Sequence, residues 1–115
     1  CVPVSHVLVD GCVYFHSNPR GYKAELLAQN PRVCLTAVAD VHAIPMRFTT
    51  EYSSAIAFGT ARLVHDPAER RRALSAICEK YAASNPHREK CAANAGPETA
   101  VYCVEIESIT GKRSE

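Results

Sequence analysis

Polar residues capable of holding an anion gather in the sequence Tyr-Phe-His-Ser-Asn-Pro-Arg-Gly-Tyr-Lys, residues 14–23. Asn18 can cap a helix and Pro19 is tolerated at the first helical position, which predicts a strand that turns directly into a helix. The first amides of a helix lack intrahelical acceptors and lie at the positive end of its dipole. Such an end favours a phosphate, which the side chains of four residues can assist, while Gly21 lets it approach the backbone: His16, Ser17, Arg20 and Lys23. The alternative is a capped surface helix with two solvated cations.

A hairpin is predicted to carry this stretch. Residues 1–9 are rich in apolar and β-branched side chains, and Asp10-Gly11 is a strong two-residue turn signal before a return strand at 12–17. In that register Ser5 faces His16 across the hairpin. Two adjacent polar side chains there fit either a binding role or a mutually satisfied structural pair.

Strands dominate the rest of the pattern. The helix that begins near Pro19 should end at Asn30-Pro31 and turn three residues toward the core: Tyr22, Leu26 and Leu27. Further strands are expected at 32–39, 46–64 and 99–109, with a loop at 40–45. Short connections and the absence of a Gly-rich dinucleotide fingerprint favour a mainly antiparallel sheet curled into a small barrel with flanking helices.

Two further features belong to this framework. Asp66-Pro67-Ala68-Glu69 is a capping box, and it precedes a helical apolar stripe at Leu74, Ile77, Cys78 and Tyr81. One face of the strand at 46–64 carries only small side chains, which would suit close approach by another backbone or a planar ligand: Ser53, Ala55, Ala57, Gly59 and Ala61.

Composition limits the classes of function. The 115 residues suit one domain, and 13 basic against 12 acidic side chains give no field that would attract nucleic acid. No apolar run is long enough for a membrane span. The six cysteines form neither a CxxC pair nor a zinc-like spacing, so reduced thiols, no disulfide and a cytoplasmic location are expected.

With these pieces placed, the chain resembles the flavin-binding split-barrel superfamily that contains pyridoxamine 5′-phosphate oxidase. Its nitroimidazole-resistance branch is the most similar. The resemblance lies in an ordered set of short motifs: Val2-Pro3-Val4-Ser5, Asp10-Gly11, Tyr14-Phe15-His16-Ser17, Gly21-Tyr22-Lys23, Leu26-Leu27, Asn30-Pro31-Arg32-Val33-Cys34, residues 54–61, Asp66-Pro67-Ala68-Glu69 and Ile109-Thr110-Gly111-Lys112-Arg113.

The resemblance implies a homodimer that binds FMN at the subunit interface. It assigns the phosphate and ribityl end of FMN to four residues: Phe15, His16, Ser17 and Lys23. It places the Val4-Ser5-His6 backbone beside the isoalloxazine ring. Lys112 and Arg113 are candidates to reach the partner's cofactor, with a frayed basic terminus as the alternative.

Two departures from the family pattern stand out. Relatives usually carry another helix and strand before the Val-Pro pair, so residues 1–115 are expected to form a single split-barrel domain that lacks them, with upstream sequence missing. Relatives often have an aromatic residue where this chain has His6.

The expected activity is that of an FMN-dependent oxidoreductase acting on a small molecule, by reducing nitro groups or oxidising a pyridoxal-like compound. No residue is assigned as a general acid or base, although His6 and His16 are the candidates. The alternatives are a split-barrel module that binds haem or a deazaflavin without turnover, and a dimer without cofactor. Metal catalysis ranks lowest.

Overall fold

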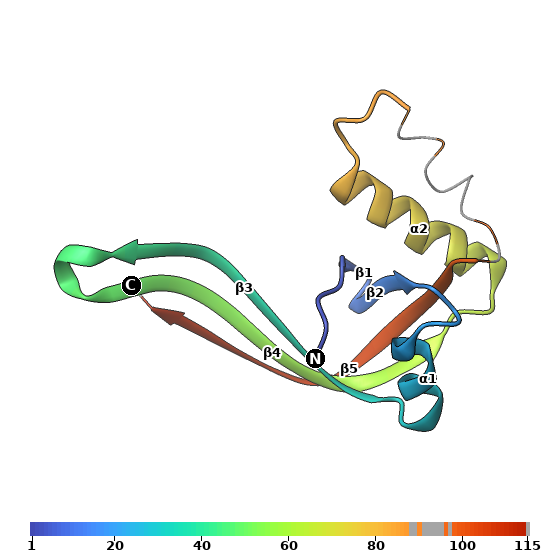
Figure 1. The fold of residues 1–115 in the computed structure, drawn as a ribbon, viewed down its shortest axis with the longest axis horizontal. Helices are drawn as coiled ribbons and strands as arrows, with labels where there is room; N and C mark the ends of the chain where they lie inside the picture. Colours follow the sequence, from blue (N-terminus) through green and yellow to red (C-terminus); the bar gives the residue numbers. More distant parts are fainter. Residues whose placement is uncertain (88–89, 91–95, 97, 115) are drawn as a thin grey trace.

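A computed structural model describes residues 1–87, 90, 96 and 98–114. In chain order its elements are β1 (Val7–Val9), β2 (Cys12–Ser17), α1 (Tyr22–Gln29), β3 (Arg32–Ile44), a 3₁₀ turn (Pro45–Arg47), β4 (Thr49–Leu63), α2 (Pro67–Tyr81) and β5 (Ala100–Ser114) (Figure 1).

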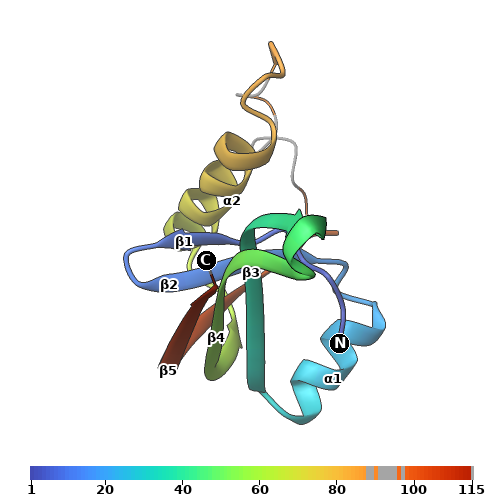
Figure 2. The same ribbon diagram turned by 90° about the vertical axis from the view of Figure 1, so that its left-hand side faces the viewer.

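The strands form one five-stranded antiparallel sheet in the order β1-β2-β5-β4-β3. Asp10 and Gly11 both have positive φ, and Val9 lies opposite Cys12, which confirms the predicted hairpin. Because β1 begins only at Val7, the expected pairing of Ser5 with His16 is not part of the sheet. Strands β1 and β2 run crosswise to β3, so the sheet curls strongly without closing (Figure 2). The predicted fold class, a mainly antiparallel split barrel with flanking helices, is confirmed.

A long arm made of β3, β4 and β5 projects away from the helices (Figure 1). The predicted loop at 40–45 was wrong, because β3 continues to Ile44 through a register irregularity between Ala39 and His42. Asp40, with φ of 54°, marks the irregularity, which hid the strand in the sequence pattern. The last strand likewise continues past 109 to Ser114, so Lys112 and Arg113 lie opposite β4 and are not a frayed end.

The two helices lie on opposite faces of the sheet, as the alternation of neighbouring β2 residues shows. Tyr14 packs with Val101, Cys103 and the buried face of α2, whereas Phe15 packs with Tyr102 and Val104 on the α1 side. The predicted capping box of α2 is confirmed, because the Asp66 carboxylate accepts a hydrogen bond from the Glu69 backbone N–H at 3.2 Å.

Helix α1 begins three residues later than predicted. Asn18 does not cap it; its side-chain oxygen accepts from the Arg20 N–H at 2.9 Å, in a turn before the helix. Of the three side chains expected to face the core, only Leu27 packs against it, whereas Tyr22 and Leu26 are exposed. The sequence pattern therefore placed two exposed residues of this short helix on its core-facing side.

The small-residue face of β4 packs inside its own chain. Ala57 and Ala61 are buried, and Gly59 lies against the backbone of β5. The opposite face, which bears Ile56 and Phe58, is the exposed one. The predicted close approach of another backbone therefore occurs within the chain, between Gly59 and β5, because the sheet curls toward the small residues and fills the space with its own core.

A partly buried ionic network joins α2 to the sheet. The Glu69 side chain is only 14% exposed. Its carboxylate accepts hydrogen bonds from both terminal nitrogens of Arg62, at 3.0 and 2.7 Å, and from the Tyr14 hydroxyl, at 2.7 Å. Arg62 also donates through Nε to Glu105 at 2.9 Å. The hydrogen bonds from Arg62, and to a lesser degree that from Tyr14, lower the pKa of Glu69 from 4.5 to about 2. Burial, together with the hydrogen bond to Glu69, raises the pKa of Tyr14.

This network predicts acid-dependent stability. Because the pKa of Glu69 is lower in the folded chain, its contribution is fully present above pH 4.5 and is lost as the pH falls toward 2. Glu69→Gln should lower the free energy of unfolding at neutral pH by about 1–3 kcal/mol and flatten the decline between those two pH values. Glu25→Gln, at an exposed position on α1, is the control for urea unfolding across this range. Equal acid profiles for wild type and Glu69→Gln would contradict this.

The thiols depart from expectation. Cys78 is disulfide-bonded, so the prediction that no disulfide forms was wrong. Cys1, Cys12, Cys34 and Cys103 are free, and burial raises the pKa of the Cys103 thiol to about 11. Cys91 lies outside the described residues. Spacing alone did not reveal the bond, because a disulfide depends on positions in space.

The disulfide carries a direct test. Thiol titration of the denatured, unreduced protein should count fewer than six thiols per chain, since Cys78 is bonded. Reduction before titration is the control and should restore the full count. Six thiols in the unreduced sample would show that the bond does not form.

Candidate functional site

A cavity of about 1020 Å³ lies between α1, the end of β2, the edge strand β3 and the amino-terminal segment. Six of the predicted site residues line it: Val4, Phe15, His16, Ser17, Gly21 and Lys23. Four do not: Ser5, His6, Arg20 and Arg113. The structure therefore brings Val4 and most of the predicted residues of 14–23 to one site, whereas Arg20 and the predicted residues Ser5, His6 and Arg113 lie outside it.

The polar end of the cavity lies at the start of α1. The N–H groups of Arg20 and Gly21 were predicted to be free for an anion. They instead donate hydrogen bonds to Asn18, Arg20 to its side-chain oxygen and Gly21 to its backbone oxygen. The helix begins after them, and its first amides with no intrahelical acceptor are those of residues 22–24. The amides open to an anion are therefore those of residues 22–24, two residues later along the chain than predicted and beside the Lys23 side chain.

Two side chains give this end its chemistry. The Lys23 ammonium lies 5.9 Å from the centre of the Phe15 ring, a cation–π distance that orients it beside the cavity. The Ser17 hydroxyl makes one long bond, 3.4 Å, to its neighbour's carbonyl, so it is available to a ligand oxygen at little cost.

Arg20 is turned toward another partner. Its guanidinium pairs with Glu98 at 3.3 Å, with both side chains largely exposed. Glu98 lines the cavity, where its negative charge would oppose a phosphate. The Arg20 guanidinium offsets part of that charge, although an ion pair this exposed is held only weakly.

Sequence reasoning missed Arg32, a second cation on the cavity wall. The signal was present, because Asn-Pro-Arg occurs at both 18–20 and 30–32. Both copies form the same turn, in which the asparagine side chain accepts the arginine N–H, at 2.9 and 3.1 Å. The repeated turns flank α1.

The apolar side of the cavity is built around two stacked aromatic rings. Phe15 stacks on Tyr102 with ring centres 5.3 Å apart and planes 16° apart, and both rings are buried. Burial raises the pKa of Tyr102, which keeps it neutral. Leu27, Val33 and Leu35 pack on the same cluster and line the cavity. The site therefore combines a cationic end with an extended apolar surface.

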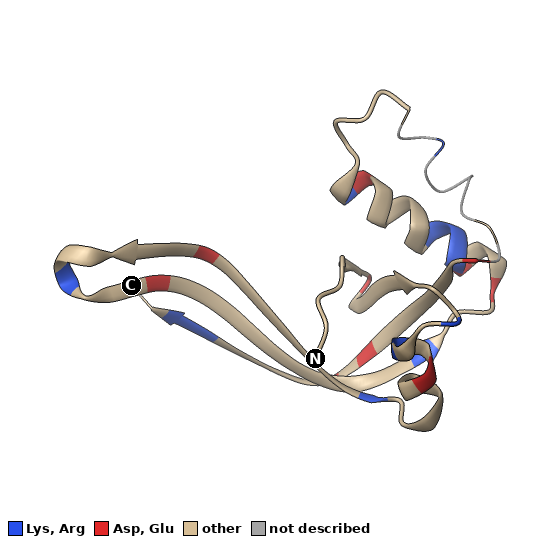
Figure 3. Ribbon diagram, in the orientation of Figure 1, with Lys and Arg blue, Asp and Glu red and all other residues tan. Residues whose placement is uncertain are grey.

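His6 and Arg113 lie apart from this cavity. The His6 carbonyl accepts hydrogen bonds from α2, and burial, with the nearby charge of Lys80, lowers the pKa of its imidazole. Arg113 lies opposite Ser53 on the arm. Lysine, arginine, aspartate and glutamate residues are spread over both the body and the arm (Figure 3).

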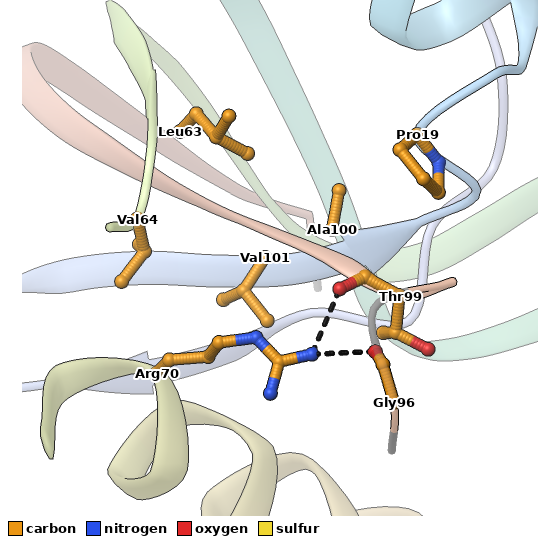
Figure 4. Close-up of a pocket in the computed structure, with 8 residues that line it drawn as sticks. All are labelled: Pro19, Leu63, Val64, Arg70, Gly96, Thr99, Ala100 and Val101. Carbon is orange, nitrogen blue, oxygen red and sulfur yellow. Dashed lines mark hydrogen bonds between the residues drawn. The ribbon is translucent and has the colours of Figure 1, made fainter. Parts of the chain in front are cut away.

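A smaller cavity, of about 450 Å³, lies between α2 and the start of β5 (Figure 4). Its walls are mainly apolar, and Arg70 donates from one nitrogen to the carbonyls of Gly96 and Thr99, both at 2.9 Å. These bonds fix the chain where it enters β5. Thr99 also borders the larger cavity, so Arg70 supports its wall from behind.

Neither a metal-binding cluster nor a membrane-spanning helix is found among the described residues. No group of three or more histidine, cysteine, aspartate or glutamate side chains among them is placed to hold a metal ion. None of the helices built from these residues is long and apolar enough to cross a membrane.

Comparison with solved structures supports the fold. A Bacteroides thetaiotaomicron protein described as a 5-nitroimidazole antibiotic resistance protein matches with TM-score 0.73 and 24% identity, over 96% of this chain and 66% of that one. An FAD and heme binding protein from Mycobacterium smegmatis matches with TM-score 0.74 and 21% identity, over 99% and 58%. An FAD-binding protein from Mesorhizobium loti matches with TM-score 0.69 and 21% identity, over 99% of this chain and 75% of that one.

The chain thus spans about two thirds or less of the first two of these proteins. No curated protein matches its sequence. The family model for pyridoxamine 5′-phosphate oxidase matches residues 1–113, almost the whole chain. The chain belongs to the pyridoxamine 5′-phosphate oxidase family.

Proposed function

We propose that this chain is a flavoprotein that holds FMN in the 1020 Å³ cavity and serves as an oxidoreductase for a small molecule. The observation that carries the proposal is the pairing of a cationic, amide-rich end with an apolar surface in one cavity. FMN has the same division, with a phosphate at one end and a flat aromatic ring system at the other.

The residues fit this group. Lys23, the Ser17 hydroxyl and the first amides of α1 would bind the phosphate, and Arg32 adds positive charge to the cavity beyond the other end of α1. The apolar side chains around Phe15 would cover the rest of the ligand. When bound, the flavin supplies electron transfer, and the protein contributes binding, orientation and exclusion of water. The FAD-binding names of two structural relatives support a flavin.

The absorbance spectrum of the purified protein tests this proposal. Oxidised-flavin bands are expected, and mass spectrometry of the ligand released on denaturation should identify FMN. Release of FAD would keep the flavoprotein and correct the cofactor. A Soret band without flavin bands would favour haem instead. Haem is the alternative ligand, and one structural relative is named as an FAD and heme binding protein.

We further propose that the working unit is a homodimer. The radius of gyration is 16.2 Å, against about 13 Å for a compact chain of this length, because the arm extends alone. One face of the arm exposes Val38, Ile56 and Phe58. Phe58 lies opposite Cys34, and Ile56 opposite Thr36, both of which line the cavity. A second copy on this face would cover the patch and the cavity rim together.

Phe58→Asp should therefore shift the protein toward monomer and reduce its flavin content at the same time, because a charge cannot be buried in an apolar interface. Light scattering and the ratio of flavin to protein absorbance measure the two effects. Glu51→Asp, a charge-conserving change further along the same strand, is the control. A wild-type monomer that retains one tightly bound flavin per chain would rule out this dimer.

A further inference from the structure

Two neighbouring side chains at the end of α2 converge on a single backbone atom. The Tyr81 hydroxyl donates to the His6 carbonyl oxygen at 2.7 Å, and the Lys80 ammonium donates to the same oxygen at 2.8 Å. The ammonium also lies 5.1 Å from the centre of the Tyr81 ring, so the two donors hold each other in place. A carbonyl oxygen has two lone pairs, and both are used here.

The atom that they hold lies in a segment with little other support. Residues 1–6 belong to no helix or strand. Of the side-chain hydrogen bonds found among the described residues, those that reach this segment both end on His6. Val7, the next residue, is buried against the α2 side of the sheet. These two hydrogen bonds, from here on the His6 clamp, therefore fix the point where the segment leaves the sheet.

The same segment forms a wall of the larger cavity. Cys1, Val2 and Val4 line it, and Val4 packs against the cluster that contains Phe15. His6 lies two residues beyond Val4 and does not line the cavity. Since the chain spans at most about 3.6 Å per residue, a carbonyl fixed at His6 keeps Val4 within about 7 Å of that point and so near the cavity.

We propose that Lys80 and Tyr81 are positioning residues that hold the amino-terminal wall of the cavity through the His6 carbonyl. By doing so they set how tightly the cavity binds its ligand, a step that rests on the proposed flavin. Neither side chain lines the cavity. Loss of a donor lets the segment move away from the sheet, and the ligand must then restore its order on binding.

The test uses Tyr81→Phe, which keeps the ring, Lys80→Met, which keeps the chain length, and the double variant. Hydrogen exchange of the ligand-free protein should rise about threefold or more in residues 1–9 and stay unchanged in β4 and β5. The flavin dissociation constant should rise about three- to tenfold in each single variant and further in the double one. Lys80→Arg keeps the cation and should show the exchange rate and the flavin dissociation constant of the wild type. Arg71→Met, at an exposed position on the same helix, is the control.

Unchanged exchange in residues 1–9 of the double variant would overturn the proposal, as would a rise spread evenly over the whole sheet. An unchanged flavin dissociation constant despite faster local exchange would overturn the link to binding. If the wild-type protein takes up no flavin, the proposed function fails. The exchange measurement would still decide whether the two donors hold the segment.

Discussion

Gly59→Ala is expected to destabilise the protein by about 2–4 kcal/mol, enough to unfold a large fraction of a marginal domain. A Cβ atom at this position would overlap the Glu105 carbonyl oxygen and lie 3.0 Å from the Glu105 carbonyl carbon and 3.2 Å from the Ile106 Cα. These are backbone atoms of the paired strand, so no side chain can turn aside. The register irregularity between Phe58 and Gly59 lies at the same place.

Gly111→Ala is the matched control, because it lies in the neighbouring strand and its Cβ would meet only the Ser54 oxygen, at 3.6 Å. This variant should change stability little. Urea unfolding of both variants measures the difference in the free energy of unfolding. Equal stability of the two variants would show that the strands separate easily at Gly59, and that the bulge does not depend on a missing side chain.

The two positions also show what the sequence can and cannot reveal. Alternation along residues 46–64 correctly separated small from large side chains, since the period of a strand is fixed. It did not show which face is covered, because that depends on how the whole sheet curls. Strand ends were missed for a related reason. Asp40 breaks the local pattern, while pairing with β4 on the far side of the irregularity restores the strand.

The candidate site divides in the same way. The stretch at 14–23 was predictable, because a strand, a turn and a helix start place its residues together locally. Arg32 reaches the cavity through the return of the chain after α1, and Cys1, Val2 and Val4 reach it from a segment that belongs to no helix or strand. Helix α1 also starts later than predicted. The Asn18 side chain accepts a hydrogen bond from the Arg20 N–H in a separate turn, and the helix begins only after that turn, at Tyr22.

Lys23→Ala is expected to weaken flavin binding by about 1.5–3 kcal/mol, the range of a charge-assisted hydrogen bond to a phosphate. Lys23 is the cation on the first turn of α1, and its position over Phe15 points it to the polar end of the cavity. Arg20→Ala should have a smaller effect, because its guanidinium is paired with Glu98.

Arg71→Ala removes the same charge from an exposed position on α2 and controls for net charge. Isothermal titration of the ligand-free proteins with FMN, and in parallel with riboflavin, separates the phosphate from the ring. The loss at Lys23 should be seen with FMN and should nearly vanish with riboflavin, since riboflavin has no phosphate for the ammonium to bind. An equal loss with both ligands would mean that Lys23 acts by supporting Phe15 and the apolar wall, and the phosphate would then lie elsewhere in the cavity, with Arg32 as the next cation to test.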